Sequence, residues 1–397
     1  MAFGVTGDLM RLKILPALFA LHEKNLLPTP FRIMGISRRS WSNAELRAHV
    51  AKVLGAAAAS EALHSFLELF CFQQCDIEDP ACFETLVSSI DILQNDSDRR
   101  PNVLMHLAIA PELYDRVFEN LAAFQNPGET PWARIMIEKP FGYDLLSAQK
   151  LNGILWESFA ESQIYRVDHY LAKIPRETLK TLRAYILENE IKHVHVRLLE
   201  SVGVEKRAQF YDATGALKDV GQNHALEILA LLTMDEDESS DVDRLRENRV
   251  AALRRLPQLS QDEVSTSTTR AQHVGYRDIP GVDPDSQTET YFEVHTMLST
   301  PHAGNIGATI ESGKRQPSPI KEIVLTRADG AMTRFSLDAK QDETEYERLI
   351  ADCIRGDQRL FVSADEAEAL WRFIDPIATA WKKNMVPLVY HSTDENK

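Results

Sequence analysis

The first third of the chain alternates short apolar runs with amphipathic stretches of helical spacing. Apolar runs of strand length lie at residues 31–37, 69–75, 103–110 and 133–139. Residues 111–124 begin with a proline suited to the first turn of a helix. Apolar side chains recur on one face of that stretch at Leu113, Val117, Leu121 and Phe124. Strands that alternate with helices in this way predict a parallel sheet covered by helices.

The pattern changes after about residue 165. Alternation of apolar and polar positions, as in half-buried strands, is present in residues 192–200, 288–298 and 322–337. The pair Asp329–Gly330 favours a tight hairpin, and Ser363–Glu366 form a capping box that opens a further helix. This half is predicted to be α+β with a mainly antiparallel sheet. We therefore expect two domains, residues 1–165 and residues 166–397.

The composition is that of a globular protein, with 44% hydrophobic and 26% charged residues among 397. No apolar run approaches the length of a membrane span, so no membrane partner is expected. The net charge of −15 argues against nucleic acid as a partner, because phosphate backbones select basic surfaces. An anionic small molecule would need a local basic pocket in such a chain. The chain has four cysteines and no C-x-x-C pair, so neither a disulfide framework nor a metal site is expected. This cysteine content is consistent with a protein of the reducing cytoplasm.

The opening stretch FGVTGDLMRLK places Gly4 and Gly7 directly before a helical pattern. Such a turn lets backbone N–H groups approach a pyrophosphate at a helix N-terminus, although many ordinary turns have the same form. Arg38 follows the predicted strand at residues 31–37. At this position dinucleotide folds use an acid to hold the 2′-hydroxyl of NAD and an arginine to accept the 2′-phosphate of NADP. The alternative is that Arg38 is an ordinary solvated arginine. If Arg38 instead accepts the 2′-phosphate, the cofactor of the predicted Rossmann-like N-terminal domain is NADP rather than NAD.

Two further stretches concentrate polar chemistry. YRVDHYLAK crowds four hydrogen-bonding side chains into six positions, namely Asp168, His169, Tyr170 and Lys173. A solvated loop would explain this stretch as well as a binding site would. In residues 215–229 the apolar spacing places His224 on the inward face of a helix, where a core histidine is commoner than a catalytic one. A catalytic histidine needs a carboxylate to orient it, and Asp168 is a candidate that spacing alone does not pair with it.

These and other stretches resemble, in chain order, the signature motifs of the glucose-6-phosphate dehydrogenase family. The motifs are FGVTGDL at the start, IEKPFG (137–142), RVDHYLAK (166–173), DVGQNH (219–224), TETYF (288–292) and SGKR (312–315). Residues 200–219 and 373–381 are also similar to the family, so the resemblance covers nearly the whole chain. A D-H-Y-L-x-K motif followed by a later D-V-x-Q-N-H is highly specific.

The resemblance implies oxidation of D-glucose 6-phosphate to 6-phospho-D-glucono-1,5-lactone with hydride transfer to NADP, the first step of the oxidative pentose phosphate pathway. It implies that His224 is the general base and that Asp168 pairs with it. Substrate-binding positions are implied at Lys139, His169, Tyr170, Lys173, Glu200, Asp219 and Lys314. Among these, His169, Tyr170 and Lys173 would hold the phosphate. Cofactor-binding positions are implied at Gly4, Thr6, Gly7, Leu9, Arg38, Asp76, Ile77 and Lys139.

Two departures from the family bear on the expected fold. Only Met1–Phe3 precede Gly4, where the family has a full apolar strand, so we expect the parallel sheet to lack its first, central strand. The C-terminal sheet is expected to be shortened around Asp329–Gly330, which bears on the homodimer or homotetramer that the resemblance implies. Two alternatives stay open: a sugar-phosphate-binding paralogue with impaired catalysis, and an oxidoreductase that acts on another sugar.

Overall fold

The computed structural model describes residues 1–55, 60–95, 101–124, 132–235, 241–300, 304–338 and 342–391. The described residues divide into two units. The first unit draws on residues 1–142, 146–172 and 342–364, and the second on residues 143–145, 173–341 and 365–397. Within the described ranges, every helix is too short or too polar to cross a membrane.

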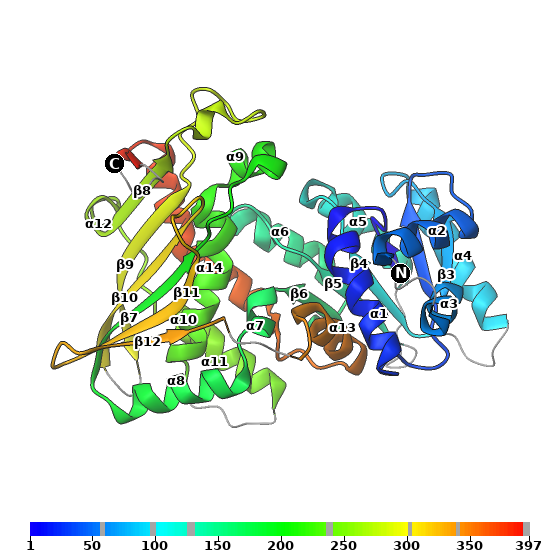
Figure 1. Ribbon diagram of the computed structural model, residues 1–397, viewed down its shortest axis with the longest axis horizontal. Coiled ribbons are helices and arrows are strands. Elements are labelled where there is room, and N and C mark those ends of the chain that lie inside the picture. The colour runs from blue at the N-terminus through cyan, green and yellow to red at the C-terminus, as the bar shows by residue number, and fades with distance from the viewer. Residues whose placement is uncertain are drawn as a thin grey trace. The chain divides into compact units, whose positions relative to one another are not determined.

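A parallel sheet forms the centre of the first unit (Figure 1). Its described strands, in spatial order, are β13 (Phe361–Val362), β6 (Ile164–Val167), β5 (Ala133–Ile137), β4 (Val103–Leu107), β1 (Ala2–Phe3), β2 (Ile33–Ser37) and β3 (Phe70–Gln74). Neighbours from β6 to β3 pair in parallel, whereas β13 pairs antiparallel with β6. The order 3-2-1-4-5-6 is that of dinucleotide-binding folds. The Rossmann-like prediction for the N-terminal part is confirmed.

The expectation that this sheet lacks its first strand is wrong, because two residues take the central place. Ala2 and Phe3 form β1 and pair in parallel with Gly35 and Ile36 of β2 on one side. On the other side they pair in parallel with β4. Both side chains are buried. Strands on either side offer backbone groups to this position, so even a two-residue strand closes the gap between them. The central strand is short rather than missing.

The first unit also contains most of the helices of the first half of the chain. They are η1 (Met10–Ile14), α1 (Leu15–Glu23), α2 (Asn43–Leu54), α3 (Glu61–Glu68), α4 (Pro80–Asn95), η3 (Pro111–Leu113), α5 (Tyr114–Asn120), η4 (Leu121–Phe124), α6 (Leu145–Trp156), η5 (Glu161–Gln163) and α7 (His169–Lys173). A later helix, α13 (Glu345–Arg355), packs against α1. Lys13 and Lys24 form ion pairs with Glu345 and Glu347 across this contact. The boundary expected between residues 165 and 166 stays a prediction.

A mainly antiparallel sheet forms the centre of the second unit. Its described strands, in spatial order, are β12 (Met332–Ser336), β11 (Ile320–Arg327), β7 (Ile191–Leu199), β10 (Gly304–Gly313), β9 (Tyr291–Thr300), β8 (Thr268–His273) and β14 (Leu388–His391). The pairs β10–β7 and β14–β8 are parallel, and the other described pairs are antiparallel. Gly330, with φ of +84°, turns the predicted hairpin between β11 and β12. The expected α+β class with a mainly antiparallel sheet is confirmed.

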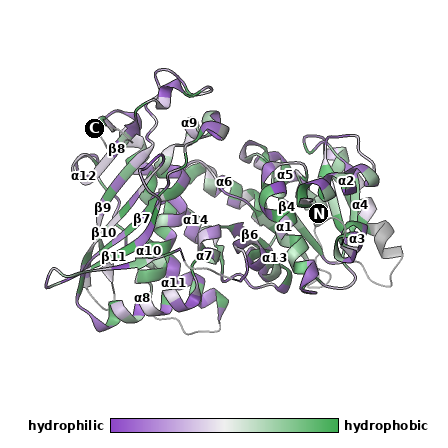
Figure 2. Ribbon diagram, in the orientation of Figure 1, coloured by the Kyte–Doolittle hydropathy of each residue, from purple (hydrophilic) through white to green (hydrophobic). Residues whose placement is uncertain are grey.

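Helices pack on one face of this sheet. The described helices of the second unit are α8 (Arg176–Glu188), η6 (Glu205–Arg207), α9 (Ala208–Ala216), η7 (Leu217–Ala225), α10 (Leu226–Thr233), α11 (Val242–Arg254), α12 (Gln261–Ser267), η8 (Tyr276–Asp278) and α14 (Ala364–Lys382). Along β7, Val194 and Val196 are buried, and η7 and α10 contact this strand. His195 and Arg197 alternate with them and are only half-buried. Figure 2 shows the resulting mixture of hydrophobic and hydrophilic positions along the strands.

Candidate active site

The glycine turn lies at the carboxyl ends of β1 and β4, where the strand order of the sheet reverses. Gly4 has φ of +74°, and a Cβ atom there would lie 2.3 Å from the carbonyl oxygen of Ala108. Only glycine fits this position. The Gly7 N–H donates to the Gly4 carbonyl at 2.8 Å, which closes the turn at the start of the first helix. Ligands of such sheets bind at this reversal point, and the predicted positions Thr6 and Leu9 lie here half-buried.

Three further predicted cofactor-binding positions lie at the same edge of the sheet, after β2 and β3. Arg38 directly follows β2 and is exposed. Asp76 is exposed and Ile77 half-buried just beyond the end of β3. The Cys75 N–H donates to the Ser37 carbonyl at 2.9 Å, so the two strand ends stay together. A positive side chain at the end of the second strand suits a 2′-phosphate, as the sequence predicted.

A disulfide that cysteine spacing did not indicate lies beside these positions. Cys75 pairs with Cys82, at the start of α4, with Cα atoms 5.4 Å apart. The loop between them contains Asp76 and Ile77. Cys71 and Cys353 are not in disulfides.

Strand β5 leads into Lys139, the residue predicted to contact both substrate and cofactor. The residue before it, Glu138, is buried. Its Oε1 lies 3.0 Å from Nε2 of His106, and its Oε2 accepts a hydrogen bond of 3.1 Å from the Tyr346 hydroxyl. Its carbonyl accepts a bond of 2.8 Å from the Tyr114 hydroxyl. Sequence reasoning missed this network, whose members come from four separate segments, and it holds the backbone from which Lys139 extends.

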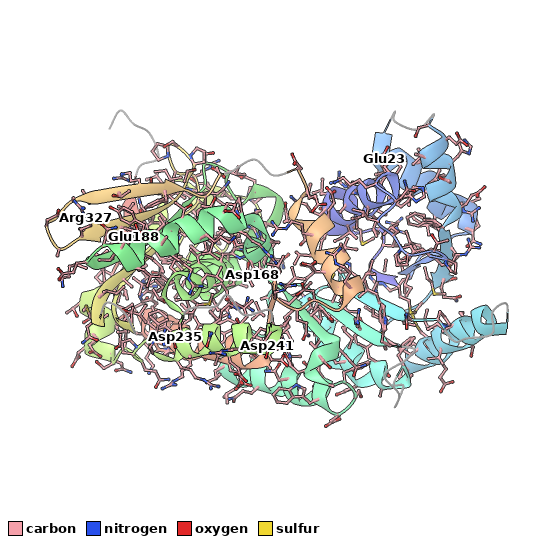
Figure 3. All side chains as sticks on the ribbon, turned by 90° about the horizontal axis from the view of Figure 1, so that it is seen from below. Glu23, Asp168, Glu188, Asp235, Asp241 and Arg327 are labelled. Atoms are coloured by element: carbon pink, nitrogen blue, oxygen red, sulfur yellow. A yellow bond between two sulfur atoms is a disulfide. The ribbon has the colours of Figure 1, made fainter. Side chains whose placement is uncertain are left out.

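The stretch YRVDHYLAK is a strand end followed by a short helix, so the solvated-loop interpretation is wrong. Asp168, labelled in Figure 3, is 2% exposed. Its Oδ1 accepts a hydrogen bond of 2.9 Å from the Tyr170 N–H and thereby caps α7. Tyr170 is buried, while His169 and Lys173 are half-buried. Helix α7 therefore carries three neighbouring side chains that are suited to a phosphate, His169, Tyr170 and Lys173.

In the second unit, the predicted catalytic histidine lies on η7, a helical segment of π type. Asp219 and His224 are both buried on it. The Asn223 side chain accepts a bond of 2.7 Å from the His224 N–H and donates one of 3.1 Å to the Lys218 carbonyl. Such π segments interrupt regular helices frequently at functional sites. Asp168 belongs to the first unit and His224 to the second, and the pairing of their side chains stays a prediction.

Asp219 belongs to a compact cluster of opposite charges. Lys314 is 2% exposed; its Nζ lies 3.1 Å from Asp219 Oδ2 and also contacts the carboxylate of Glu200. Arg207 donates to both oxygens of Asp219, at 2.9 and 3.3 Å. Sequence reasoning predicted Glu200, Asp219 and Lys314 but missed Arg207. Paired donors and acceptors of this kind suit the hydroxyl groups of a sugar, each of which both donates and accepts.

Comparison with known proteins decides the family. The family model described as "Glucose-6-phosphate dehydrogenase, NAD binding domain" matches residues 1–178. The one described as "Glucose-6-phosphate dehydrogenase, C-terminal domain" matches residues 180–341 and 328–396. The chain belongs to the glucose-6-phosphate dehydrogenase family. The resemblance drawn from the sequence motifs is confirmed, and with it the assignment of the chain to a family of oxidoreductases.

Members of the glucose-6-phosphate dehydrogenase family match almost the full chain. The glucose-6-phosphate 1-dehydrogenase of Bacillus subtilis (strain 168) is 30% identical, with 96% of this chain and 91% of that protein covered. The crystal structure of glucose-6-phosphate 1-dehydrogenase from Mycobacterium avium matches with a TM-score of 0.83 at 27% identity, over 98% of this chain and 92% of that one. A glucose-6-phosphate dehydrogenase in complex with its substrate glucose-6-phosphate matches with a TM-score of 0.85 at 25% identity, over 99% and 93%.

Proposed function

We propose that this chain oxidises D-glucose 6-phosphate to 6-phospho-D-glucono-1,5-lactone and transfers the hydride to NADP. One observation carries the proposal within the family: a single buried helical segment presents His224 together with Asp219, and Asp219 is tied to Lys314 and Arg207. That arrangement provides a base beside groups that bind sugar hydroxyls. A relative of the same fold is described in complex with glucose-6-phosphate, which supports the substrate.

In the proposed reaction, His224 removes the proton of the sugar's C1 hydroxyl. Asp168 stabilises the imidazolium that forms, and Asn223 holds the backbone of the base. Glu200, Asp219 and Lys314 orient the ring hydroxyls. The oxidised nicotinamide of NADP, when bound, accepts the hydride from C1.

The phosphate and the cofactor call for local positive charge in a chain of net charge −15. We assign the phosphate to His169, Tyr170 and Lys173, which all lie on the short helix α7. Gly4 and Gly7 would cradle the pyrophosphate of NADP, and Arg38 would meet its 2′-phosphate. Lys139 would contact both ligands. We further propose a cytoplasmic homodimer or homotetramer, which size-exclusion chromatography with light scattering would test.

Two variants test the reaction and the phosphate assignment together. His224→Asn should lower kcat by on the order of 10²–10⁴, the usual contribution of a positioned general base, with little change in sugar-phosphate binding by calorimetry. Lys173→Ala should raise KM for glucose 6-phosphate by roughly ten- to a hundredfold, because a charge-assisted contact is lost, and should hardly change turnover of free glucose. Near-normal turnover in His224→Asn would remove the base from the mechanism. Equal losses on both sugars would make Lys173 structural.

A further inference from the structure

The motif Thr288–Glu289–Thr290 has no part in the reaction proposed above, yet it contacts the segments that carry the sugar site. We propose that Glu289 is a positioning residue: it fixes the start of the helix that carries Asp219 and His224, while its neighbour Thr290 fixes the backbone of Lys314. This inference rests on the proposed function of that site.

Glu289 caps the helix with both its side chain and its backbone. The Leu217 N–H donates to Glu289 Oε1 at 2.9 Å, and the Ala216 N–H donates to the Glu289 carbonyl at 3.1 Å. The first N–H groups of a helix have no partner within the helix. A carboxylate is well suited to them, because it accepts hydrogen bonds and complements the positive end of the helix dipole. Asp219 lies in the first turn after this cap, and His224 in the second.

The backbone before the helix is shaped around the same carboxylate. Gly215 has φ of +75°, a conformation that favours glycine. A Cβ atom at this position would lie 2.3 Å from Glu289 Oε1. Glycine is therefore required at residue 215 both by its conformation and by the approach of Glu289. The G-A-L-K-D stretch and the T-E-T stretch, distant in sequence, form one complementary unit.

Thr290, the next residue in the chain, anchors Glu289 and connects it to further segments of the second unit. Thr290 is fully buried. Its N–H donates a hydrogen bond to the Ala271 carbonyl at 2.8 Å, and its hydroxyl oxygen accepts a hydrogen bond of 2.8 Å from the His273 N–H. The Thr290 carbonyl in turn accepts from the Lys314 N–H at 2.8 Å. Two consecutive residues, Glu289 and Thr290, thus connect strand β8, the Asp219 helix and the Lys314 turn. A shift of Glu289 would move Asp219 and Lys314 relative to each other.

The carboxyl group of Glu289 has a pKa close to neutral pH. Burial raises its pKa to about 7, although the Leu217 hydrogen bond and the positive charges of Arg270 and Lys218 oppose that rise. The hydroxyls of Tyr211 and Tyr276 also lie in its electrostatic range, and their own pKa values are raised, so they stay neutral. An ionised Glu289 is the stronger acceptor for the helix N–H groups. A protonated carboxyl group also keeps an acceptor oxygen, so the Leu217 N–H has a partner on Glu289 in either protonation state.

Two substitutions separate the effect of the length of the Glu289 side chain from the effect of its charge. Glu289→Asp keeps the charge but withdraws the carboxylate from Leu217, whereas Glu289→Gln keeps the reach and an acceptor oxygen but loses the charge. Glu289→Asp should lower kcat/KM for glucose 6-phosphate by roughly ten- to a hundredfold, as small displacements in an active site do, and Glu289→Gln by less than about threefold. KM for NADP should not change in either. Glu311→Gln is the matched control, a buried glutamate in strand β10 whose carboxylate pairs with Arg197.

Hydrogen–deuterium exchange gives a reading that does not depend on turnover. Peptides that contain the Ala216 and Leu217 N–H groups should exchange faster in Glu289→Asp than in the wild type, and no faster in Glu289→Gln. Unchanged exchange in Glu289→Asp, or activity in Glu289→Asp with none in Glu289→Gln, would overturn the positioning role. A wild-type chain without activity on glucose 6-phosphate and NADP would instead refute the proposed function, and the exchange data would still decide the inference.

Discussion

The hydrogen bonds of Glu138 fix the backbone that precedes Lys139, so the loss of one of them should lower both stability and activity. His106→Leu removes the imidazole partner of Glu138 Oε1 in a region where His106 and Glu138 are 6% and 8% exposed. The other ring nitrogen of His106, Nδ1, is buried without a hydrogen-bond partner among the described residues. A proton there would be an unsatisfied buried donor, so we assign the proton to Nε2, where it is donated to Glu138.

The expected loss follows from that bond. A hydrogen bond to a charged group contributes about 1.5–3 kcal/mol to stability. Glu138 Oε1 is buried, so water cannot easily replace the lost imidazole as its hydrogen-bond donor. We therefore expect His106→Leu to lower the free energy of unfolding by about 2–3 kcal/mol. His106→Gln, whose amide can donate from a similar place, should lose about half as much. Because Glu138 directly precedes Lys139, kcat/KM for glucose 6-phosphate should fall in parallel.

Urea denaturation followed by tryptophan fluorescence would measure the change, since Trp41 and Trp132 lie in the first unit. A double-mutant cycle with Glu138→Gln isolates the pair, and a coupling energy of at least about 1 kcal/mol is expected for residues in contact. A loss below about 0.5 kcal/mol in His106→Leu, the range of ordinary surface substitutions, would refute this account. So would full additivity in the cycle.

Two further predictions concern pH and the cofactor. The pKa of Glu289 is about 7 in the folded protein and 4.5 as an ordinary value, so the folded state keeps this proton up to a higher pH than the unfolded state does. The free energy of unfolding, relative to that of Glu289→Gln, should therefore be highest below pH 4.5 and should fall by up to on the order of 3 kcal/mol as the pH rises through 7. Melting curves of both proteins at pH 4.5 to 8.5 check this, and parallel curves would contradict it. Arg38→Ala should raise KM for NADP far more than KM for NAD, and equal changes would show that Arg38 does not meet the 2′-phosphate.

Four described strands of the first unit could be predicted from the sequence because strands of a parallel sheet that helices cover form near-continuous apolar runs, whereas β1, β6 and β13 were not predicted. Each of the apolar runs at residues 31–37, 69–75, 103–110 and 133–139 contains a strand, slightly shorter than the run. Strand ends depend on which neighbours offer hydrogen bonds, and periodicity does not contain that information. For the same reason β1 escaped prediction: two residues form a strand only because β2 and β4 flank them. The helix expected at residues 111–124 is a succession of η3, α5 and η4.

The supporting contacts of the candidate site could not be predicted from the sequence, although the motifs named the residues that we assign to it. Motifs located Lys139, Asp219 and Lys314, but the partners that hold them come from elsewhere in the chain. His106 meets Glu138 across 32 residues, and Glu289 meets Leu217 across 72. A single sequence has no signal for which distant polar groups meet, because only the fold brings them together. Arg207 lies just 12 residues before Asp219, yet arginines at such a distance are common on solvated surfaces.

The cluster around Lys314 leads to a last prediction, which concerns the part of the substrate it recognises. Lys314 and Arg207 contribute two positive charges, and Asp219 and Glu200 contribute two negative ones, so the cluster is neutral as a whole. A neutral cluster does not attract a phosphate, but its fixed donors and acceptors can bind hydroxyl groups. Lys314→Gln should therefore raise KM for glucose 6-phosphate and for free glucose by similar factors, on the order of tenfold or more. Lys173→Ala, in contrast, should affect mainly the phosphorylated sugar. If Lys314→Gln spares free glucose, Lys314 contacts the phosphate and the assignment of the two lysines must be exchanged.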